Sequence, residues 1–268
     1  MTDILGGPRS EPLPYLDRPF IAMAHRGGWI DPADEARENT RYAFSRAVEL
    51  GYEYLETDVR ATADGQLVVF HDALLDRVSD ATGPLAERTW ADLAAVRIGG
   101  IDPIARLEDV LEEFPSVRFN LDLKDRRAVE PLAELVRRTG SSHRVCVASF
   151  SGARLAAFRR LAGPDVVTAV TPAGVAWYGF IPLLRRLPLD AGQVLQVPAR
   201  LGRGRVRLVR RDMVAAVHAA GRLVHVWTVD DMVEAERLLD LGVDGLITNR
   251  IAPLKELLQA RGLWRGTE

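Results

Sequence analysis

Cysteine, lysine and long apolar runs are the scarce features of this sequence. Cys146 is the only cysteine among 268 residues, which excludes a disulfide within the chain. The most apolar window, residues 173–184, falls short of the roughly 18 residues that a membrane-spanning helix needs. The first nineteen residues contain four prolines and no continuous apolar core of signal-peptide length. We therefore expect a cytoplasmic protein with no transmembrane segment.

An excess of one charge is also missing. The 35 Lys and Arg residues nearly balance the 37 Asp and Glu residues, and the formal net charge is −2. Nucleic-acid binding depends on neutralising several phosphates, and this chain has no overall positive field for that purpose. The composition therefore predicts no nucleic-acid partner and favours a small-molecule ligand.

Short apolar, β-branched runs alternate along the chain with amphipathic segments, most of which end at a glycine, the usual residue just past a helix. Strands that alternate with helices pair in parallel, because a parallel partner needs a crossover of about a dozen residues. Eight such runs predict a single domain over residues 1–268, an α/β protein of the (β/α)8 TIM-barrel class. The expected strands are residues 20–25, 54–59, 117–123, 144–149, 166–170, 194–197, 223–228 and 243–248.

Residues 73–114 interrupt this alternation. They contain no obvious barrel strand, and the patterns at residues 89–97 and 106–114 predict helices. We expect a small insertion here, on the loop face of the barrel.

A hairpin is predicted just before the insertion, at Asp64-Gly65. The runs at residues 54–59 and 66–71 are too close in sequence for a helical crossover, and Asp-Gly is a strong signal for a two-residue type I′ turn. With these two residues as the loop, Asp58 pairs directly with His71, and Glu56 shares the face of Asp58.

Three carboxylates are expected at one mouth of the barrel. Asp122 belongs to the third strand, and Glu56 and Asp58 belong to the second. Active sites of this architecture occur at the carboxyl ends of the strands. Carboxylate oxygens suit a hard cation, so these three residues are predicted ligands of Ca²⁺ or Mg²⁺. For Glu56 and Asp58 alone, two solvated carboxylates at a strand end are the alternative interpretation.

Two histidines and two cations are expected at the same mouth. His25-Arg26 closes the first strand, His71 ends the hairpin, and Lys124 follows the third strand. Arg26 and Lys124 suit an anionic group such as phosphate. His25 and His71 can supply an acid and a base near neutral pH.

A series of short motifs runs along the chain: His25-Arg26-Gly27, Glu38-Asn39-Thr40, Glu56-Thr57-Asp58, Asp64-Gly65, Val68 to Asp72, Asn120 to Lys124, Trp227 to Asp230 and Asp244 to Thr248. In kind and order this series resembles the glycerophosphodiester phosphodiesterase family over most of residues 20–255. The resemblance implies a TIM barrel with a small insertion after His71.

The resemblance also implies roles for the acidic and imidazole groups. Glu56, Asp58 and the third-strand carboxylate would hold the metal, and His25 and His71 would perform acid–base catalysis. The third ligand of the family is usually Glu, whereas Asp122 is one methylene shorter.

The remaining site residues follow from the same resemblance. Arg26 and Lys124 would bind phosphate, and Trp227 would line the pocket. Three further positions depart from the family pattern: Asp230 stands where Asn is usual, Asn249 where Asp is usual, and Arg106 where Thr is frequent.

The leading hypothesis is metal-dependent hydrolysis of glycerophosphodiesters to sn-glycerol 3-phosphate and an alcohol, by two-histidine acid–base catalysis. One alternative is a lysophospholipase D-like hydrolase of lipid phosphodiesters, in which the segment around Trp177 seats the acyl chain. Another is a non-catalytic barrel that binds phospho-ligands. Residues 173–186 would provide a peripheral lipid contact, or would form a packed helix or loop with core aromatics.

Overall fold

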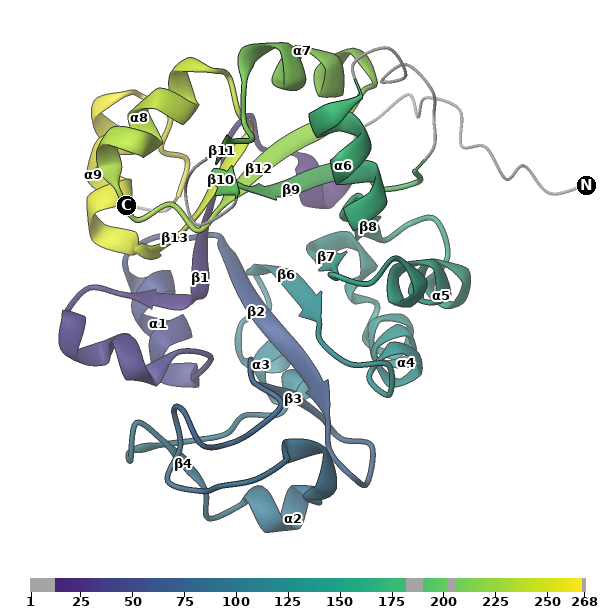
Figure 1. Ribbon diagram of the computed structural model, residues 1–268. Helices are drawn as coiled ribbons and strands as arrows, with labels where there is room; N and C mark the ends of the chain where they lie inside the picture. Colours follow the sequence, from purple (N-terminus) through teal and green to yellow (C-terminus); the bar gives the residue numbers. More distant parts are fainter. Residues whose placement is uncertain (1–12, 182–189, 202–205, 267–268) are drawn as a thin grey trace, which may run out of the picture.

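The computed structural model describes residues 13–181, 190–201 and 206–266. Its main sheet joins parallel strands in the order β8-β7-β6-β2-β1-β13-β12-β9, and a parallel bridge from Ala169 to Val194 connects β8 to β9. The ring therefore closes, and the predicted (β/α)8 TIM barrel is confirmed (Figure 1). The strands are β1 (Ile21–Trp29), β2 (Tyr54–Ala61), β6 (Arg118–Leu123), β7 (Val145–Ala148), β8 (Val167–Thr168), β9 (Val194–Pro198), β12 (Leu223–Trp227) and β13 (Gly245–Arg250).

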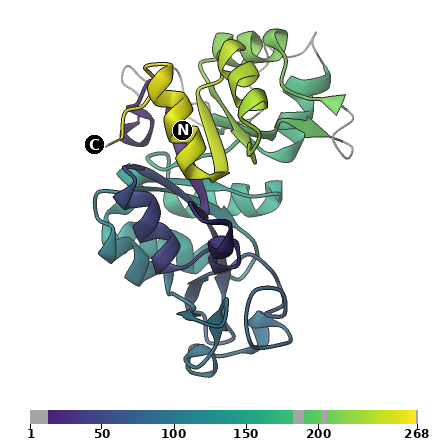
Figure 2. The same ribbon diagram turned by 90° about the vertical axis from the view of Figure 1, so that its left-hand side faces the viewer.

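Helices surround this ring, as Figures 1 and 2 show from two sides. Their ends follow local chemistry: the Thr40 and Ser151 side chains cap α1 and α5 by accepting hydrogen bonds from backbone N–H groups, and Gly140 ends α4 with φ 62°. The longer helices are α1 (Arg41–Glu49), α3 (Leu107–Glu113), α4 (Val129–Thr139), α5 (Gly152–Ala162), α6 (Pro172–Phe180), α7 (Arg211–Ala219), α8 (Met232–Asp240) and α9 (Ile251–Ala260). Short 3-10 helices are Pro14–Leu16, Pro32–Arg37, Leu85–Glu87 and Ser141–Arg144, and β10 (Arg200–Leu201) pairs antiparallel with β11 (Val206–Arg207).

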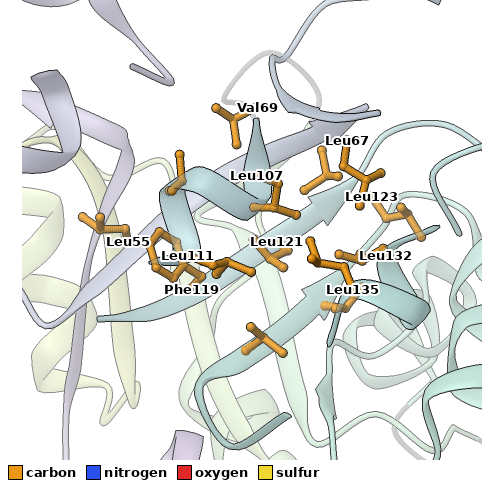
Figure 3. Close-up of a cluster of buried hydrophobic side chains, with 14 of the residues drawn as sticks. Leu55, Leu67, Val69, Leu107, Leu111, Phe119, Leu121, Leu123, Leu132 and Leu135 are labelled. Atoms are coloured by element: carbon orange, nitrogen blue, oxygen red, sulfur yellow. The ribbon is translucent and has the colours of Figure 1, made fainter. Parts of the chain in front are cut away.

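Side chains of β6 point alternately outward into the hydrophobic core and inward into the barrel. Phe119, Leu121 and Leu123 are fully buried in a cluster with leucines of α3 and α4, which Figure 3 shows in close-up. Burying one such side chain contributes about 1.5 to 3 kcal/mol. Because neighbouring residues of a strand point to opposite faces, Asn120 and Asp122 point into the barrel.

The hairpin has a different register from the predicted one. β3 (Leu67–Val69) is antiparallel to β2, with Val59 opposite Val69, so Asp58 faces Phe70 rather than His71. The loop has three residues: Gly65 has φ 81°, whereas Asp64 is absent from the positive-φ residues that a type I′ turn requires at both positions. The predicted Asp58–His71 pairing is therefore wrong by one residue.

The part of residues 73–114 that precedes α3 extends away from the ring below β2 and β3, whereas α3 itself packs on the ring (Figure 1). The extended part holds α2 (Trp90–Leu93) and the two-residue strands β4 (Arg97–Ile98) and β5 (Asp102–Pro103), and it shares a buried cluster with Val68 and Phe70. The helix predicted at residues 89–97 ends at Leu93, because residues 97–98 pair with β5 instead. That this segment is an insertion in one domain stays a prediction. In the part of the chain that the structure describes, no helix has the length and hydropathy of a bilayer span.

Candidate active site

One pocket of about 410 Å³ lies inside the mouth of the barrel. All eight site residues predicted from the sequence line it: His25, Arg26, Glu56, Asp58, His71, Asp122, Lys124 and Trp227. Three adjacent strands bring most of them together. His25 pairs with Glu56 across β1 and β2, and Asp58 pairs with Asp122 across β2 and β6. His71 enters the pocket from just beyond β3, in spite of the shifted hairpin register.

A left-handed turn inside β1 places Arg26. Arg26, Gly27 and Gly28 have φ values of 53°, 88° and 63°, and the register of β1 on β13 shifts at this point. A left-handed conformation is costly for a residue with a side chain, and such strain tends to persist at functional sites. A Cβ atom on Gly27 would lie 2.6 Å from the Cβ atom of Ala43, so the turn packs directly on α1.

Asp58 is the centre of an ionic network. Its Oδ1 lies 2.9 Å from Lys124 Nζ and its Oδ2 lies 3.0 Å from Arg26 Nε. Lys124 Nζ also lies 2.6 Å from Asp122 Oδ2. Burial alone would raise the pKa of Asp58, but Lys124 and Arg26 outweigh it and lower this pKa. Burial likewise works against the charge of Lys124, yet Asp58 and Asp122 raise its pKa overall.

The surroundings of Glu56 favour a charged carboxylate less than those of Asp58 do. Its Oε2 accepts a hydrogen bond from the backbone N–H of Arg26 at 3.1 Å and lies 3.7 Å from His25 Nε2. Burial and the neighbouring Asp58 raise the pKa of Glu56 well above its usual value. The positive charges of Arg26 and Lys124 lower this pKa but do not outweigh burial and Asp58. Burial, helped by Arg26, lowers the pKa of His25.

Asn249 and Asp230 orient His25, a contact that the sequence did not reveal. The Nδ2 group of Asn249 donates to Asp230 Oδ2 at 2.8 Å, which turns the amide oxygen toward His25 Nδ1 at 2.7 Å. His25 Nδ1 must then be the donor, because an amide oxygen only accepts. Neutral His25 therefore keeps Nε2 free to take a proton. The only signal in the sequence was that these same two positions depart from the family pattern.

Arg77 connects the two sides of the ionic site, and no sequence signal singled it out. His71 Nδ1 lies 2.6 Å from Asp72 Oδ1, and the Arg77 guanidinium donates to Asp72. Arg77 also donates to Glu38, which accepts from Arg26 Nη1 at 3.1 Å. The start of the 73–114 segment thus links His71 to Arg26 through charged hydrogen bonds.

The three carboxylates match a hard divalent cation in chemistry. Among the described residues, no three His, Cys, Asp or Glu side chains are grouped closely enough to hold a metal ion, and Lys124 lies between Asp58 and Asp122. Asp122 Oδ1, however, is a buried acceptor without a hydrogen-bond partner, which a cation would satisfy. Oxygen donors of this kind are what Ca²⁺ and Mg²⁺ bind.

The sequence and fold match known phosphodiesterases. The profile of the glycerophosphoryl diester phosphodiesterase family matches residues 25–252. The chain is 38% identical over 267 residues to a Mycobacterium tuberculosis protein named "Probable glycerophosphodiester phosphodiesterase 2", covering 97% of this chain and 98% of that one. Its fold is similar to that of a glycerophosphodiester phosphodiesterase from Parabacteroides distasonis, with a TM-score of 0.74 and 25% identity over 91% and 99% of the two chains. An Oleispira antarctica phosphodiesterase, solved in complex with the product sn-glycerol-3-phosphate, has the same fold, with a TM-score of 0.72 and 21% identity over 89% and 96% of the two chains.

Proposed function

The chain belongs to the glycerophosphoryl diester phosphodiesterase family and is a phosphoric diester hydrolase, and we propose that it cleaves glycerophosphodiesters with a divalent cation and two acid–base histidines. The products would be sn-glycerol 3-phosphate and an alcohol. The observation that carries this proposal is that two imidazoles, three carboxylates and two cationic side chains line a single pocket.

The cationic groups suit the charge changes of phosphodiester cleavage. Attack on phosphorus increases the negative charge on the non-bridging oxygens, and Arg26 and Lys124 would stabilise that increase. Glu56, Asp58 and Asp122 would hold Ca²⁺ or Mg²⁺, which supplies further positive charge beside the phosphoryl group when bound. The unpartnered Oδ1 of Asp122 supports this ligand set.

The histidines would move the protons. One imidazole takes a proton from the attacking water or from the glycerol 2-hydroxyl, and the other gives a proton to the departing alcohol as its bond to phosphorus breaks. The free Nε2 of His25 supports a role in this transfer. His71 is held in the same manner, by a contact from its Nδ1 to Asp72.

Choline release from glycerophosphocholine tests the proposal. The purified chain should release choline with Mg²⁺ or Ca²⁺ and lose the activity in EDTA, and added cation should restore it. Activity that persists in EDTA would contradict the metal requirement alone. If no added cation supports choline release, the proposed activity is wrong.

Two further expectations stay predictions. One is the cytoplasmic location. The other is a lipid contact through residues 173–186, of which 182–186 lie outside the described residues.

A further inference from the structure

His71 is the less enclosed of the two imidazoles. His25 belongs to β1, whereas His71 lies beyond the end of β3, in a segment that is neither helix nor strand. The His71 side chain is 32% exposed, against 16% for that of His25. Its backbone is held, because its carbonyl accepts a hydrogen bond from Arg60 Nε at 2.8 Å. The direction of the ring therefore depends on the contact between Nδ1 and Asp72.

Asp72 in turn depends on Arg77. Its Oδ1 contacts His71 and its Oδ2 accepts a hydrogen bond from Arg77 Nε, so each oxygen serves a different partner. Burial works against the charge of Asp72, but His71 and Arg77 lower its pKa overall. Because the two oxygens of a carboxylate are rigidly joined, fixing Oδ2 also fixes the direction of Oδ1. The Arg77 guanidinium thus controls how Asp72 meets the imidazole.

Glu38 anchors the other end of the Arg77 side chain. Both Nη groups of Arg77 donate to Glu38, whose two oxygens also accept from Arg26 Nη1 at 3.1 Å. The next residue, Asn39, ties this part of the chain to the barrel. Its backbone N–H donates to the carbonyl of Arg26, and its Nδ2 donates to Asp58 Oδ2 at 2.8 Å. The Glu38 carboxylate is therefore held from the ionic side of the pocket.

The 73–114 segment fixes the backbone of Arg77. Arg77 lies in a turn that is closed by hydrogen bonds from the backbone N–H and Oγ of Ser79 to the carbonyl of Leu75. Leu75 is fully buried in the apolar cluster of that segment. Arg77, Asp72 and Glu38 do not belong to the described lining of the pocket. Arg77 is thus placed to act on the reaction through other residues rather than by contact with the substrate.

An arginine suits this place because its planar guanidinium donates in fixed directions to two carboxylates at once. We propose that Arg77 is a positioning residue for His71. It joins the anchored carboxylate of Glu38 to that of Asp72, and Asp72 sets the direction of the imidazole toward the phosphodiester. This inference rests on the proposed function, and it gives the 73–114 segment a part in catalysis.

The experiment removes the guanidinium and measures choline release from glycerophosphocholine at saturating Mg²⁺. Arg77→Met should lower kcat by roughly 10-fold to 100-fold, because a small displacement of an acid–base group is costly in rate. KM should change by less than about twofold, since Arg26 and Lys124 keep their contacts with Asp58. The thermal midpoint should move by less than about 3 °C, because exposed ion pairs contribute little to stability.

Three further variants separate positioning from charge and from stability. Arg77→Lys keeps the charge but cannot bridge both carboxylates, so kcat should stay at least about fivefold below wild type. Asp72→Ala already removes the contact to His71, so adding Arg77→Met to it should lower kcat by less than about twofold further. Arg138→Met is the matched control and should leave kcat and KM unchanged. Arg138 is 53% exposed, donates to Glu108 of the 73–114 segment and lies outside the described pocket lining.

Several results would overturn the inference. A wild-type kcat in Arg77→Met, with or without a change in KM, would do so and leave the proposed function standing. The same holds if Arg77→Lys is fully active, because the charge alone would then suffice. It also holds if the losses of Arg77→Met and Asp72→Ala multiply in the double variant, because the two residues would then act independently. No choline release from the wild type would overturn the proposed function as well.

Discussion

At the scale of single residues, His25 and His71 are held in the same way, each by a polar partner at Nδ1. If they exchange the protons of the reaction, His25→Ala or His71→Ala should lower kcat for glycerophosphocholine by roughly 10² to 10⁴. His143→Ala is the control, because His143 is exposed, lies outside the pocket lining and forms a hydrogen bond with the carbonyl of Gly140. Turnover close to wild type in either active-site variant would end the two-histidine scheme.

The pair formed by Asp230 and Asn249 gives a second prediction at this scale. Asn249→Asp alone would place two carboxylates in contact next to His25, and kcat should fall by about tenfold, equivalent to about 1.4 kcal/mol. Adding Asp230→Asn restores one amide and one carboxylate, so the double variant should recover most of the loss. Turnover on glycerophosphocholine and thermal midpoints check both steps. A double variant no better than the single one would show that the contact does not orient His25.

The sequence was sufficient to predict which side chains would lie in one pocket, but not the contacts that they make there. Residue type and strand position brought all eight predicted residues to one pocket. Lys124 between two carboxylates, and Arg77 on Asp72 and Glu38, depend on rotamers and on segments far apart in sequence. Local patterns carry no information on either.

At the scale of elements, the left-handed turn of β1 leaves less room for a side chain than the hairpin loop does. Gly27→Ala combines a positive φ with overlap against Ala43 and should reduce the free energy of unfolding by about 2 to 5 kcal/mol. Gly65→Ala has a positive φ but no atom within 4 Å of the added Cβ, so it should cost only about 1 kcal/mol. Chemical denaturation of both variants measures the difference. Equal losses would mean that α1 does not press on the turn.

The register of the hairpin could not be predicted from the Asp64-Gly65 signal alone. Asp-Gly fits both a two-residue loop and a three-residue loop with glycine in the left-handed position. The two differ by one residue in pairing, and that difference decides whether His71 or Phe70 faces Asp58. The choice is made where Val68 and Phe70 pack into the cluster of residues 73–114, which is a non-local contact.

At the scale of the whole molecule, one buried histidine should limit stability in acid. His225 on β12 is completely buried outside the pocket, its ring nitrogens have no partners among the described residues, and burial lowers its pKa to about 3. Below pH ~6.5 the unfolded chain binds a proton there that the folded chain does not, so stability falls with pH. Between pH 7 and pH 5, wild type should lose about 2 kcal/mol more than His225→Leu. Unfolding free energies at the two pH values test this, and parallel losses would contradict it.

The barrel as a whole was predictable for a simple reason. Each strand and helix is encoded locally, by an apolar run or by an amphipathic segment with a cap and a glycine stop, and parallel strands linked by helices have few ways to close. Within residues 73–114, the two helices have such local patterns but the strands do not. The strands β4 and β5 are two residues long, and they depend on pairing with each other and on a bridge from Ile98 to Ser79.

The seam of the ring, where β8 meets β9, has fewer strand-pairing contacts than the rest. β8 has only two residues, and it meets β9 through one bridge and backbone hydrogen bonds from Gln193 to Thr168 and from Val170 to Val194. Amide deuterium uptake should therefore begin at this seam, well before β1 and β2 exchange. Since Val170 lines the pocket, opening of this seam would also enlarge the pocket on that side, while the strands that carry the carboxylates stay paired.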